Sequence, residues 1–107
     1  MADVASFFAA LPARLDKARI ENENCVLQFN LSGDPNGNWH LVLENGNATV
    51  HPGTAASPTV TVAMEAADFF SLIEGKLSGQ AAFLMGKLRV QGDMGVAMRL
   101  RSILALG

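Results

Sequence analysis

The sequence predicts a mixed α and β fold in which an antiparallel sheet packs against helices. Four segments between residues 25 and 64 alternate apolar and polar side chains, with the period of two that is typical of one-sided strands. The segments before and after them repeat apolar residues at the three-and-four spacing of amphipathic helices. A chain of 107 residues has the size of one domain, so we expect residues 1–107 to form a single unit.

The first helix is expected over residues 2–17. Val4, Phe8 and Leu11 fall on one helical face, which would pack on the sheet. Pro12 lacks a backbone N–H and predicts a kink or break in the middle of this helix. A polar stretch then separates the helix from the strands.

The strands are predicted by their alternation and by the turns between them. Asn45 and Gly46 readily adopt a positive φ at both positions, so a two-residue hairpin is expected there. Four successive strands with short turns indicate an antiparallel sheet with one face in water. The expected strands are residues 25–32, 39–44, 47–51 and 59–64.

The second part of the chain returns to helical spacing after Glu65, which is expected to cap a helix that ends before Gly75. Asp93 has the residue type of an N-cap and is expected to begin the final helix. The remaining elements are expected to be helices at residues 66–74, 79–85 and 94–106 and a strand at 87–91.

The final helix is unusually apolar. Apolar residues cover more than half of its circumference, and only Gly95, Arg99 and Ser102 form a narrow polar strip. A helix that lies on a sheet normally needs an apolar stripe only somewhat wider than about 100°. A neighbouring helix, a partner chain or a ligand must cover the additional width, and the pattern leaves these three alternatives open.

Composition excludes some classes of function. Half of the residues are apolar, and eight Lys and Arg against ten Asp and Glu give a net charge of −2, which lacks the basic face that nucleic acid requires. Cys25 is the only cysteine, so no disulfide can form within the chain, as expected in a reducing compartment. We see neither a secretory signal nor an apolar run long enough to span a membrane, and we therefore expect a cytoplasmic protein.

Several motifs occur in an order that is typical of one family. Residues 85–93, Met-Gly-Lys-Leu-Arg-Val-Gln-Gly-Asp, lead from a strand into the last helix. A Thr-Val-Thr-Val strand at 59–62, then Asp-Phe at 68–69 and Gly-Lys at 75–76 precede them. With these motifs the chain resembles the type-2 sterol carrier protein family of non-specific lipid-transfer domains over residues 6–104. The 107 residues contain neither a peroxisomal C-terminal tripeptide nor an enzyme domain, so we expect a stand-alone bacterial-type member to be the better comparison.

The resemblance implies an α+β fold with a five-stranded, mostly antiparallel sheet, helices packed on one face, and an apolar tunnel between the sheet and the C-terminal helix. It also implies a non-catalytic carrier for a fatty acid, acyl-CoA, sterol-like molecule or isoprenoid quinone intermediate, without a cofactor or a metal. Transient membrane contact and self-association stay open. The alternative is a protein-interaction module that uses the same apolar surface to form a dimer or to bind a lipid-metabolising enzyme.

The apolar residues of the last three helices and the strand between them are the candidate ligand-binding residues. Arg101 lies within the apolar arc of the final helix, where it could pair with a carboxylate or phosphate headgroup or extend to solvent. Methionine suits a surface that adapts to varied ligands. The candidates are Phe69, Phe70, Ile73, Phe83, Leu84, Met85, Val90, Met94, Met98, Arg101 and Leu104.

Catalysis finds little support in the sequence. Cys25 lies on the apolar face of its predicted strand, which is typical of an inert buried thiol. His40 and His51 fall on the polar faces of neighbouring strands and lack further ligands for a metal site. No nucleophile elbow, phosphate loop or Cys-x-x-Cys occurs, so no catalytic residue is predicted.

Overall fold

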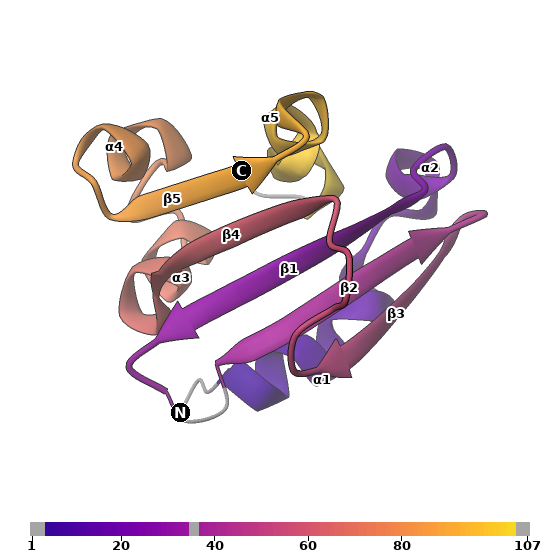
Figure 1. The fold of residues 1–107 in the computed structure, drawn as a ribbon, viewed down its shortest axis with the longest axis horizontal. Coiled ribbons are helices and arrows are strands. Elements are labelled where there is room, and N and C mark those ends of the chain that lie inside the picture. The colour runs from indigo at the N-terminus through magenta and orange to yellow at the C-terminus, as the bar shows by residue number, and fades with distance from the viewer. Residues whose placement is uncertain (1–3, 35–36, 105–107) are drawn as a thin grey trace.

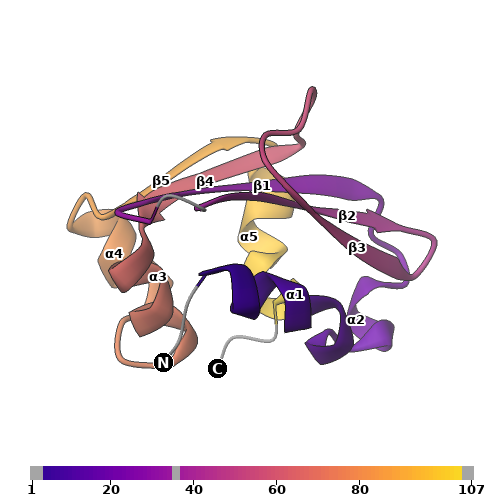
Figure 2. The same cartoon turned by 90° about the horizontal axis from the view of Figure 1, so that it is seen from below.

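The computed structural model describes residues 4–34 and 37–104, with only the backbone at Arg101, and has an α+β fold in two layers (Figure 1). Figure 2 shows the helices on one face of a five-stranded sheet, which confirms the predicted fold class. We call the opposite face the open face. The elements in chain order are α1 (Val4–Arg14), α2 (Lys17–Ile20), β1 (Cys25–Ser32), β2 (Asn38–Glu44), β3 (Asn47–Pro52), β4 (Val60–Glu65), α3 (Ala66–Ile73), α4 (Gly79–Leu84), β5 (Leu88–Gly92) and α5 (Met94–Ile103).

The strand order across the sheet is β3-β2-β1-β4-β5. β1 pairs antiparallel with β2, β2 with β3 and β4 with β5, whereas β4 pairs parallel with β1. The prediction of a mostly antiparallel sheet is therefore confirmed. The parallel pair arises because residues 53–59 carry the chain from the outer strand β3 back across β2 and β1 before β4 begins, as Figure 1 shows.

The side chain of Gln28 holds this crossing segment on the open face. It is only 1% exposed, and its Nε2 donates hydrogen bonds to the carbonyl oxygens of Trp39 (3.2 Å) and Gly53 (3.3 Å). Its Oε1 accepts a hydrogen bond from the N–H of Ala55 at 2.7 Å. Since a buried amide is costly unless its donors and acceptors are satisfied, Gln28 specifies where the chain crosses the sheet.

The hairpin between β2 and β3 forms as predicted. Asn45 and Gly46 have φ angles of 52° and 79°, the left-handed values that a two-residue turn of the type I′ class requires. Glu44 and Asn47 are paired directly before and after the turn.

The first helix differs from its prediction. α1 continues through Pro12 and ends at Arg14, and a separate helix α2 begins after Asp16, whose carboxylate accepts a hydrogen bond from the N–H of Ala18 at 2.9 Å. Pro12 cannot donate the helical hydrogen bond to the carbonyl oxygen four residues earlier, and α1 ends two residues after it. Residues 2–3 and 105–106 of the predicted helices lie outside the described residues.

Aromatic rings fill the space between α1 and the sheet. The ring of Phe8 is fully buried and stacks on Trp39, with centroids 5.5 Å apart, and on Phe69, at 5.9 Å. Phe29 of β1 lies 5.3 Å from the same ring. Pairs at these distances add to the stability that burial alone provides. This cluster closes the core beneath β1 and β2.

Candidate functional site

An apolar cavity of about 470 Å³ lies beside this aromatic cluster, between the sheet, α3, the segment that follows it, and α5. Its volume falls in the range of roughly 300–1,000 Å³ that is usual for small-molecule sites. Among the described residues that line it, only Ser78 has a polar side chain. The lining residues are Phe29, Val62, Met64, Phe69, Leu72, Gly75, Leu77, Ser78, Gly79, Leu88, Val90, Ala97, Leu100 and Leu104.

The sheet forms one wall of the cavity because alternate side chains of three neighbouring strands point to the helical side. Phe29, Val62 and Val90 pair across β1, β4 and β5 and form one row. Met64 and Leu88 form the next row. The alternation that predicts the strands therefore also produces a continuous apolar surface.

The helix α5 forms a second wall of the cavity, and its position there accounts for part of its wide apolar arc. Val96 and Ile103 are buried in the core, and the neighbouring positions Ala97 and Leu100 line the cavity. Met98, farther around the helix, is 83% exposed. One part of the apolar arc of α5 therefore packs on the core, a second part lines the cavity, and a third part is exposed to solvent. From the sequence alone, a neighbouring helix, a partner chain and a ligand were the three alternatives for covering this arc.

The third wall is the turn from α3 to α4. Gly75 has a φ of 78° and ends α3 as predicted, and the N–H groups of Lys76 and Leu77 donate to the carbonyl oxygen of Ser71, which turns the chain beneath the sheet. The side chain of Ser78 then caps α4 through the N–H of Ala81 at 3.1 Å. Gly75 and Gly79 add no side chains to this wall, and a Cβ at either position would meet no atom within 4 Å.

The predicted ligand-binding residues divide into four groups. Phe69, Val90 and Leu104 line the cavity. Phe70 and Ile73 are half-buried and pack against the core next to it. The side chain of Arg101 lies outside the described residues. The others are exposed at the surface and do not line the cavity: Phe83, Leu84, Met85, Met94 and Met98.

The exposure of these five side chains follows from their positions on the two helices. Met94 and Met98 are four residues apart on α5 and share a face that points away from the buried Val96. Phe83 and Leu84 end a helix of six residues that buries only Ala82. Apolar composition therefore does not predict which side of these two helices faces inward.

Several lining residues were not predicted. Val62 and Leu88 alternate with Val90 on one face of the sheet, and this alternation could have identified them once β4 and β5 were paired. No sequence pattern marks Ala97 and Gly79 as lining residues, because their contribution to the cavity is their small size. The predicted tunnel, in the sense of a passage through the protein, stays a prediction.

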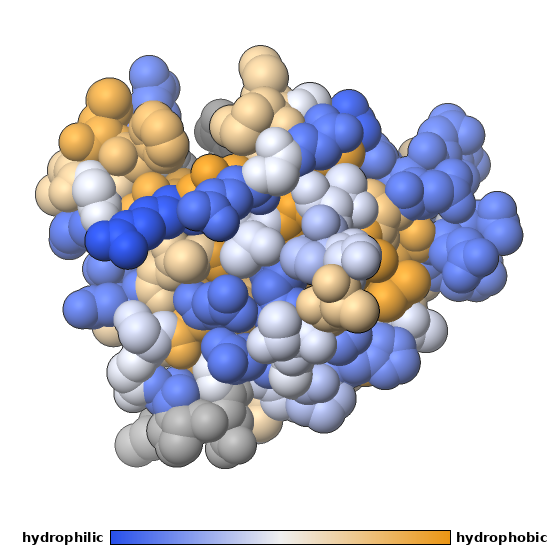
Figure 3. Space-filling view, in the orientation of Figure 1, coloured by the Kyte–Doolittle hydropathy of each residue, from blue (hydrophilic) through white to orange (hydrophobic). Residues whose placement is uncertain are grey.

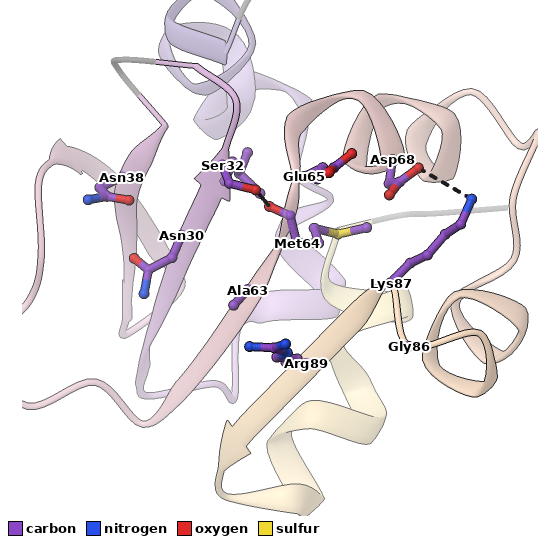
Figure 4. A pocket seen from close by; sticks show the side chains of 11 residues that line it. Asn30, Ser32, Asn38, Ala63, Met64, Glu65, Asp68, Gly86, Lys87 and Arg89 are labelled. Atoms are coloured by element: carbon purple, nitrogen blue, oxygen red, sulfur yellow. Dashed lines mark hydrogen bonds and ion pairs between the residues drawn. The ribbon is translucent and has the colours of Figure 1, made fainter.

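A second hollow, of about 660 Å³, lies on the open face and has a different chemistry (Figure 4). A cross-strand row of Asn38, Asn30, Ala63 and Arg89 forms its floor, and the small Ala63 leaves room above it. At its rim an ion pair of 3.8 Å joins Lys87 to Asp68. Although this hollow is larger, its amide and charged groups do not suit an apolar ligand.

The residues considered for catalysis lie apart from the cavity. Cys25 is buried, and burial, followed by the nearby carboxylate of Glu23, raises the pKa of its thiol, which disfavours a reactive thiolate. His40 and His51 pair across the hairpin on the open face, with ring centroids 5.3 Å apart. Within residues 4–34 and 37–104 no three His, Cys, Asp or Glu side chains gather as a metal site would require.

One ion pair fixes α5 at the end of the sheet. The guanidinium of Arg99 donates from Nε and a terminal nitrogen to the two carboxylate oxygens of Glu23, at 2.9 and 3.1 Å. This hydrogen bonding raises the pKa of Arg99. Asp93 caps the same helix through the N–H groups of Gly95 and Val96, as predicted. The cap at Asp93 and the ion pair of Arg99 together fix the position of α5, which forms one wall of the cavity.

Comparison with known proteins assigns the chain and its fold to a family. A profile of the SCP-2 sterol transfer family matches residues 7–105. The chain belongs to this family. Hydroxysteroid dehydrogenase-like protein 2 of Xenopus tropicalis is 36% identical over 91% of the chain, which covers 24% of that protein. The chain thus spans about a quarter or less of the length of these curated relatives.

Solved structures agree with this assignment. The sterol carrier protein domain 2 of Helicoverpa armigera has a TM-score of 0.76 at 29% identity, over 94% of this chain and 84% of that one. The palmitated SCP2L2 of Aedes aegypti also has a TM-score of 0.76, at 25% identity, over 96% of this chain and 95% of that one. Membership in the SCP-2 family supports lipid binding or transfer as the general role of the chain.

Proposed function

We propose that this chain is a non-catalytic lipid carrier, which holds an apolar ligand in the cavity between β1, β4, β5, the α3–α4 turn and α5. The observation that carries the proposal is the cavity itself, whose walls are almost entirely apolar side chains and whose volume is about 470 Å³. Membership in a family named for sterol transfer points in the same direction.

The ligand class follows from the lining. Among the described lining residues, the α3–α4 turn offers a ligand the hydroxyl of Ser78 and the backbone of Gly75 and Gly79. An acyl chain would occupy the apolar part between Met64 and Leu100, and its carboxyl group would lie toward the α3–α4 turn. Fatty acids are the first candidates, because the relative from Aedes aegypti is described as palmitated. Acyl-CoA, sterol-like and isoprenoid ligands are the other members of the class, and a cytoplasmic location stays a prediction.

The proposal does not involve chemistry on the ligand. Cys25, His40 and His51, the three residues with nucleophilic or acid–base side chains that we considered, do not line the cavity. Some relatives are named as enzymes, for example the peroxisomal multifunctional enzyme A of Dictyostelium discoideum, of which this chain covers 15%. Such relatives join an SCP-2 segment to a much longer chain, and their activity is not assigned to this one.

The experiment that tests the proposal is native mass spectrometry of the purified chain, followed by solvent extraction and identification of any bound lipid. The delipidated protein should then take up palmitate saturably with a stoichiometry of about one, since one acyl chain would occupy the cavity described above. A protein that is purified without lipid and ignores fatty acids, sterols and quinones would contradict the proposal.

A further inference from the structure

The polar hollow on the open face is not used by the proposed function. Figure 3 shows this face, over which the hydrophilic residues of β5 form a band. The hollow has a volume of about 660 Å³ and lies over β1, β4 and β5, the same three strands whose other face forms a wall of the apolar cavity. A hollow of this size has room for a small molecule.

Two rows of side chains bound the hollow, because alternate residues of a strand point to the same face of a sheet. In the first row Asn30 of β1 pairs with Ala63 of β4, which pairs with Arg89 of β5. In the second row Glu65 follows Ala63 by two residues, and Lys87 precedes Arg89 by two. Figure 4 shows Asn30 and Arg89 on either side of Ala63. The small methyl group of Ala63 therefore leaves a space between an amide and a guanidinium.

The hydrogen bonds of Gln28 fix the orientation of the Asn30 amide. The Oε1 of Gln28 accepts a hydrogen bond from the backbone N–H of Ala55, so the donor of this side chain is its Nε2. That Nε2 donates to the Oδ1 of Asn30 at 3.0 Å. The Nδ2 group of Asn30 has no partner among the residues that the structure describes, and it remains as a donor for a ligand.

The charged side chains that line the hollow sum to zero. Glu65 and Asp68 are acidic, Lys87 and Arg89 are basic, and Asp34, in the loop after β1, does not line it. Lys87 and Asp68 form the ion pair of 3.8 Å at the rim. Within the described part of the chain, neither Glu65 nor Arg89 forms an ion pair or a side-chain hydrogen bond. One anionic and one cationic side chain thus stay unpaired at the same hollow.

Glu65 and Arg89 lie close enough for one small molecule to reach both. Arg89 is paired with Ala63, which precedes Glu65 by two residues on the neighbouring strand. The spacing of strands and the rise per residue place the Cα atoms of Glu65 and Arg89 roughly 8 Å apart. Both side chains are exposed, and a direct ion pair between exposed side chains contributes little. No strong contact therefore holds these two charges away from a ligand.

We propose that this hollow binds a small zwitterion of the amino acid or short peptide class. Its carboxylate accepts hydrogen bonds from the guanidinium of Arg89 and the Nδ2 of Asn30, and its ammonium group donates to the carboxylate of Glu65. A simple anion would be attracted by Arg89 but repelled by Glu65, and a simple cation would meet the reverse. The inference goes beyond the proposed function and does not depend on it, because these three residues do not line the apolar cavity.

The experiment is a titration of the isotope-labelled full chain with glycylglycine, followed by NMR through the backbone amide signals of Ala63 and Arg89. N-acetylglycylglycine, which lacks the ammonium group, and glycylglycine amide, which lacks the carboxylate, are the matched probes. The test variants are Arg89→Gln and Glu65→Gln, each of which removes one exposed charge. Lys17→Gln and Glu21→Gln remove the same charges at exposed positions in and directly after α2 and are the matched controls.

We expect glycylglycine to bind saturably with a Kd of about 1 mM, since two exposed charge-assisted contacts make a weak site. Each blocked peptide should bind at least roughly fivefold more weakly to wild type, and each test variant should lose as much for glycylglycine, whereas the controls stay within about twofold. In Arg89→Gln, glycylglycine and its amide should bind within about twofold of one another, because the carboxylate has lost its main partner. In Glu65→Gln, the same should hold for glycylglycine and its acetylated form.

Other results overturn the inference. These are the absence of a saturable shift at up to about tenfold the expected Kd, shifts confined to residues outside the hollow, and equal binding of glycylglycine and both blocked forms. If Glu65→Gln rather than Arg89→Gln abolishes the discrimination against the amide, the assigned placement of the two charged groups is wrong.

Palmitate uptake separates this inference from the carrier function. Uptake should be equal in wild type and both test variants, because neither side chain lines the cavity. A chain that binds glycylglycine at the hollow but takes up no palmitate would support the zwitterion site and contradict the carrier function. A chain that takes up palmitate but not glycylglycine would support the carrier function and overturn the zwitterion site.

Discussion

The two halves of the helical layer pack against the same sheet in opposite ways. Beneath β1 and β2 the ring of Phe8 contacts the rings of Phe29 and Trp39 and leaves a closed core. Beneath β4 and β5 the facing helix presents Ala97, and the α3–α4 turn presents glycine, so that a cavity of about 470 Å³ remains. The difference comes from side-chain size in both layers, because Phe8 of α1 faces strand aromatics, whereas Ala97 of α5 faces Val62 and Val90. The closed half provides stability, and the half with the cavity provides room.

The largest expected effect is on the closed half. Replacing Phe8 by Ala should lower the free energy of unfolding by about 3–5 kcal/mol, because the ring is fully buried and stacks on both sides. Urea unfolding followed by far-ultraviolet circular dichroism measures the loss. Phe8→Leu, which keeps most of the volume, should lose about 1–2 kcal/mol and keeps the comparison measurable if the alanine variant does not fold.

Met98→Ala serves as the control for that experiment. Its side chain is 83% exposed, so its removal should change stability by less than about 0.5 kcal/mol. A loss of under about 1 kcal/mol for Phe8→Ala would show that the aromatic cluster is not the stabilising half.

The other side of the closed half depends on Gln28. Replacing it by Leu should cost about 1–3 kcal/mol, because the N–H of Ala55 and the carbonyl oxygens of Trp39 and Gly53 lose their partner. Thr49→Ala, at an exposed position of β3, is the control. Equal urea midpoints for Gln28→Leu and wild type would mean that the crossing segment does not need this side chain.

The half with the cavity should respond differently, losing function without losing stability. Ala97→Phe places a ring in the cavity and should lower palmitate affinity at least roughly tenfold, whereas the free energy of unfolding should change by less than about 1 kcal/mol. Titration with a fluorescent fatty acid measures the affinity. Ala9→Phe, on the exposed side of α1, is the matched control. Undiminished uptake by Ala97→Phe would place the ligand elsewhere.

The smallest effect concerns pH. Burial raises the pKa of the Cys25 thiol above that of the unfolded chain, so the thiol contributes its full stability below the unfolded pKa. As the pH rises above about 8.5, the unfolded chain ionises first and this contribution is lost. The difference in unfolding free energy between wild type and Cys25→Ala should therefore shrink from pH 7 to pH 10. A difference that grows with pH would contradict the assigned direction.

The sequence predicts the elements and the fold class well, since alternation and helical spacing are local and the sheet has one wet face. The pairing of strands depends on residues that are far apart in the sequence and is therefore harder to predict. The parallel contact of β1 with β4 depends on a crossing segment whose anchor, Gln28, lies among the polar positions of its strand and carries no special pattern.

The candidate site was predicted only in part, because the sequence does not show which apolar residues point inward. Apolar residues such as Met98 and Leu84 are visible in the sequence but point outward, whereas Ala97 and Gly79 shape the cavity by lacking volume. Helical spacing reports which residues share a face. It does not report which face a short helix turns toward the core.

The measurement that tests the central claim most directly is methionine-methyl NMR of the delipidated chain during titration with palmitate. Met64 lines the cavity and is only 6% exposed, whereas Met94 and Met98 lie at the surface. If the cavity holds the ligand, the Met64 methyl signal should shift and saturate while the Met98 signal stays in place. An unchanged Met64 signal, with shifts confined to Met94 and Met98, would contradict it and show that the lipid binds outside the protein.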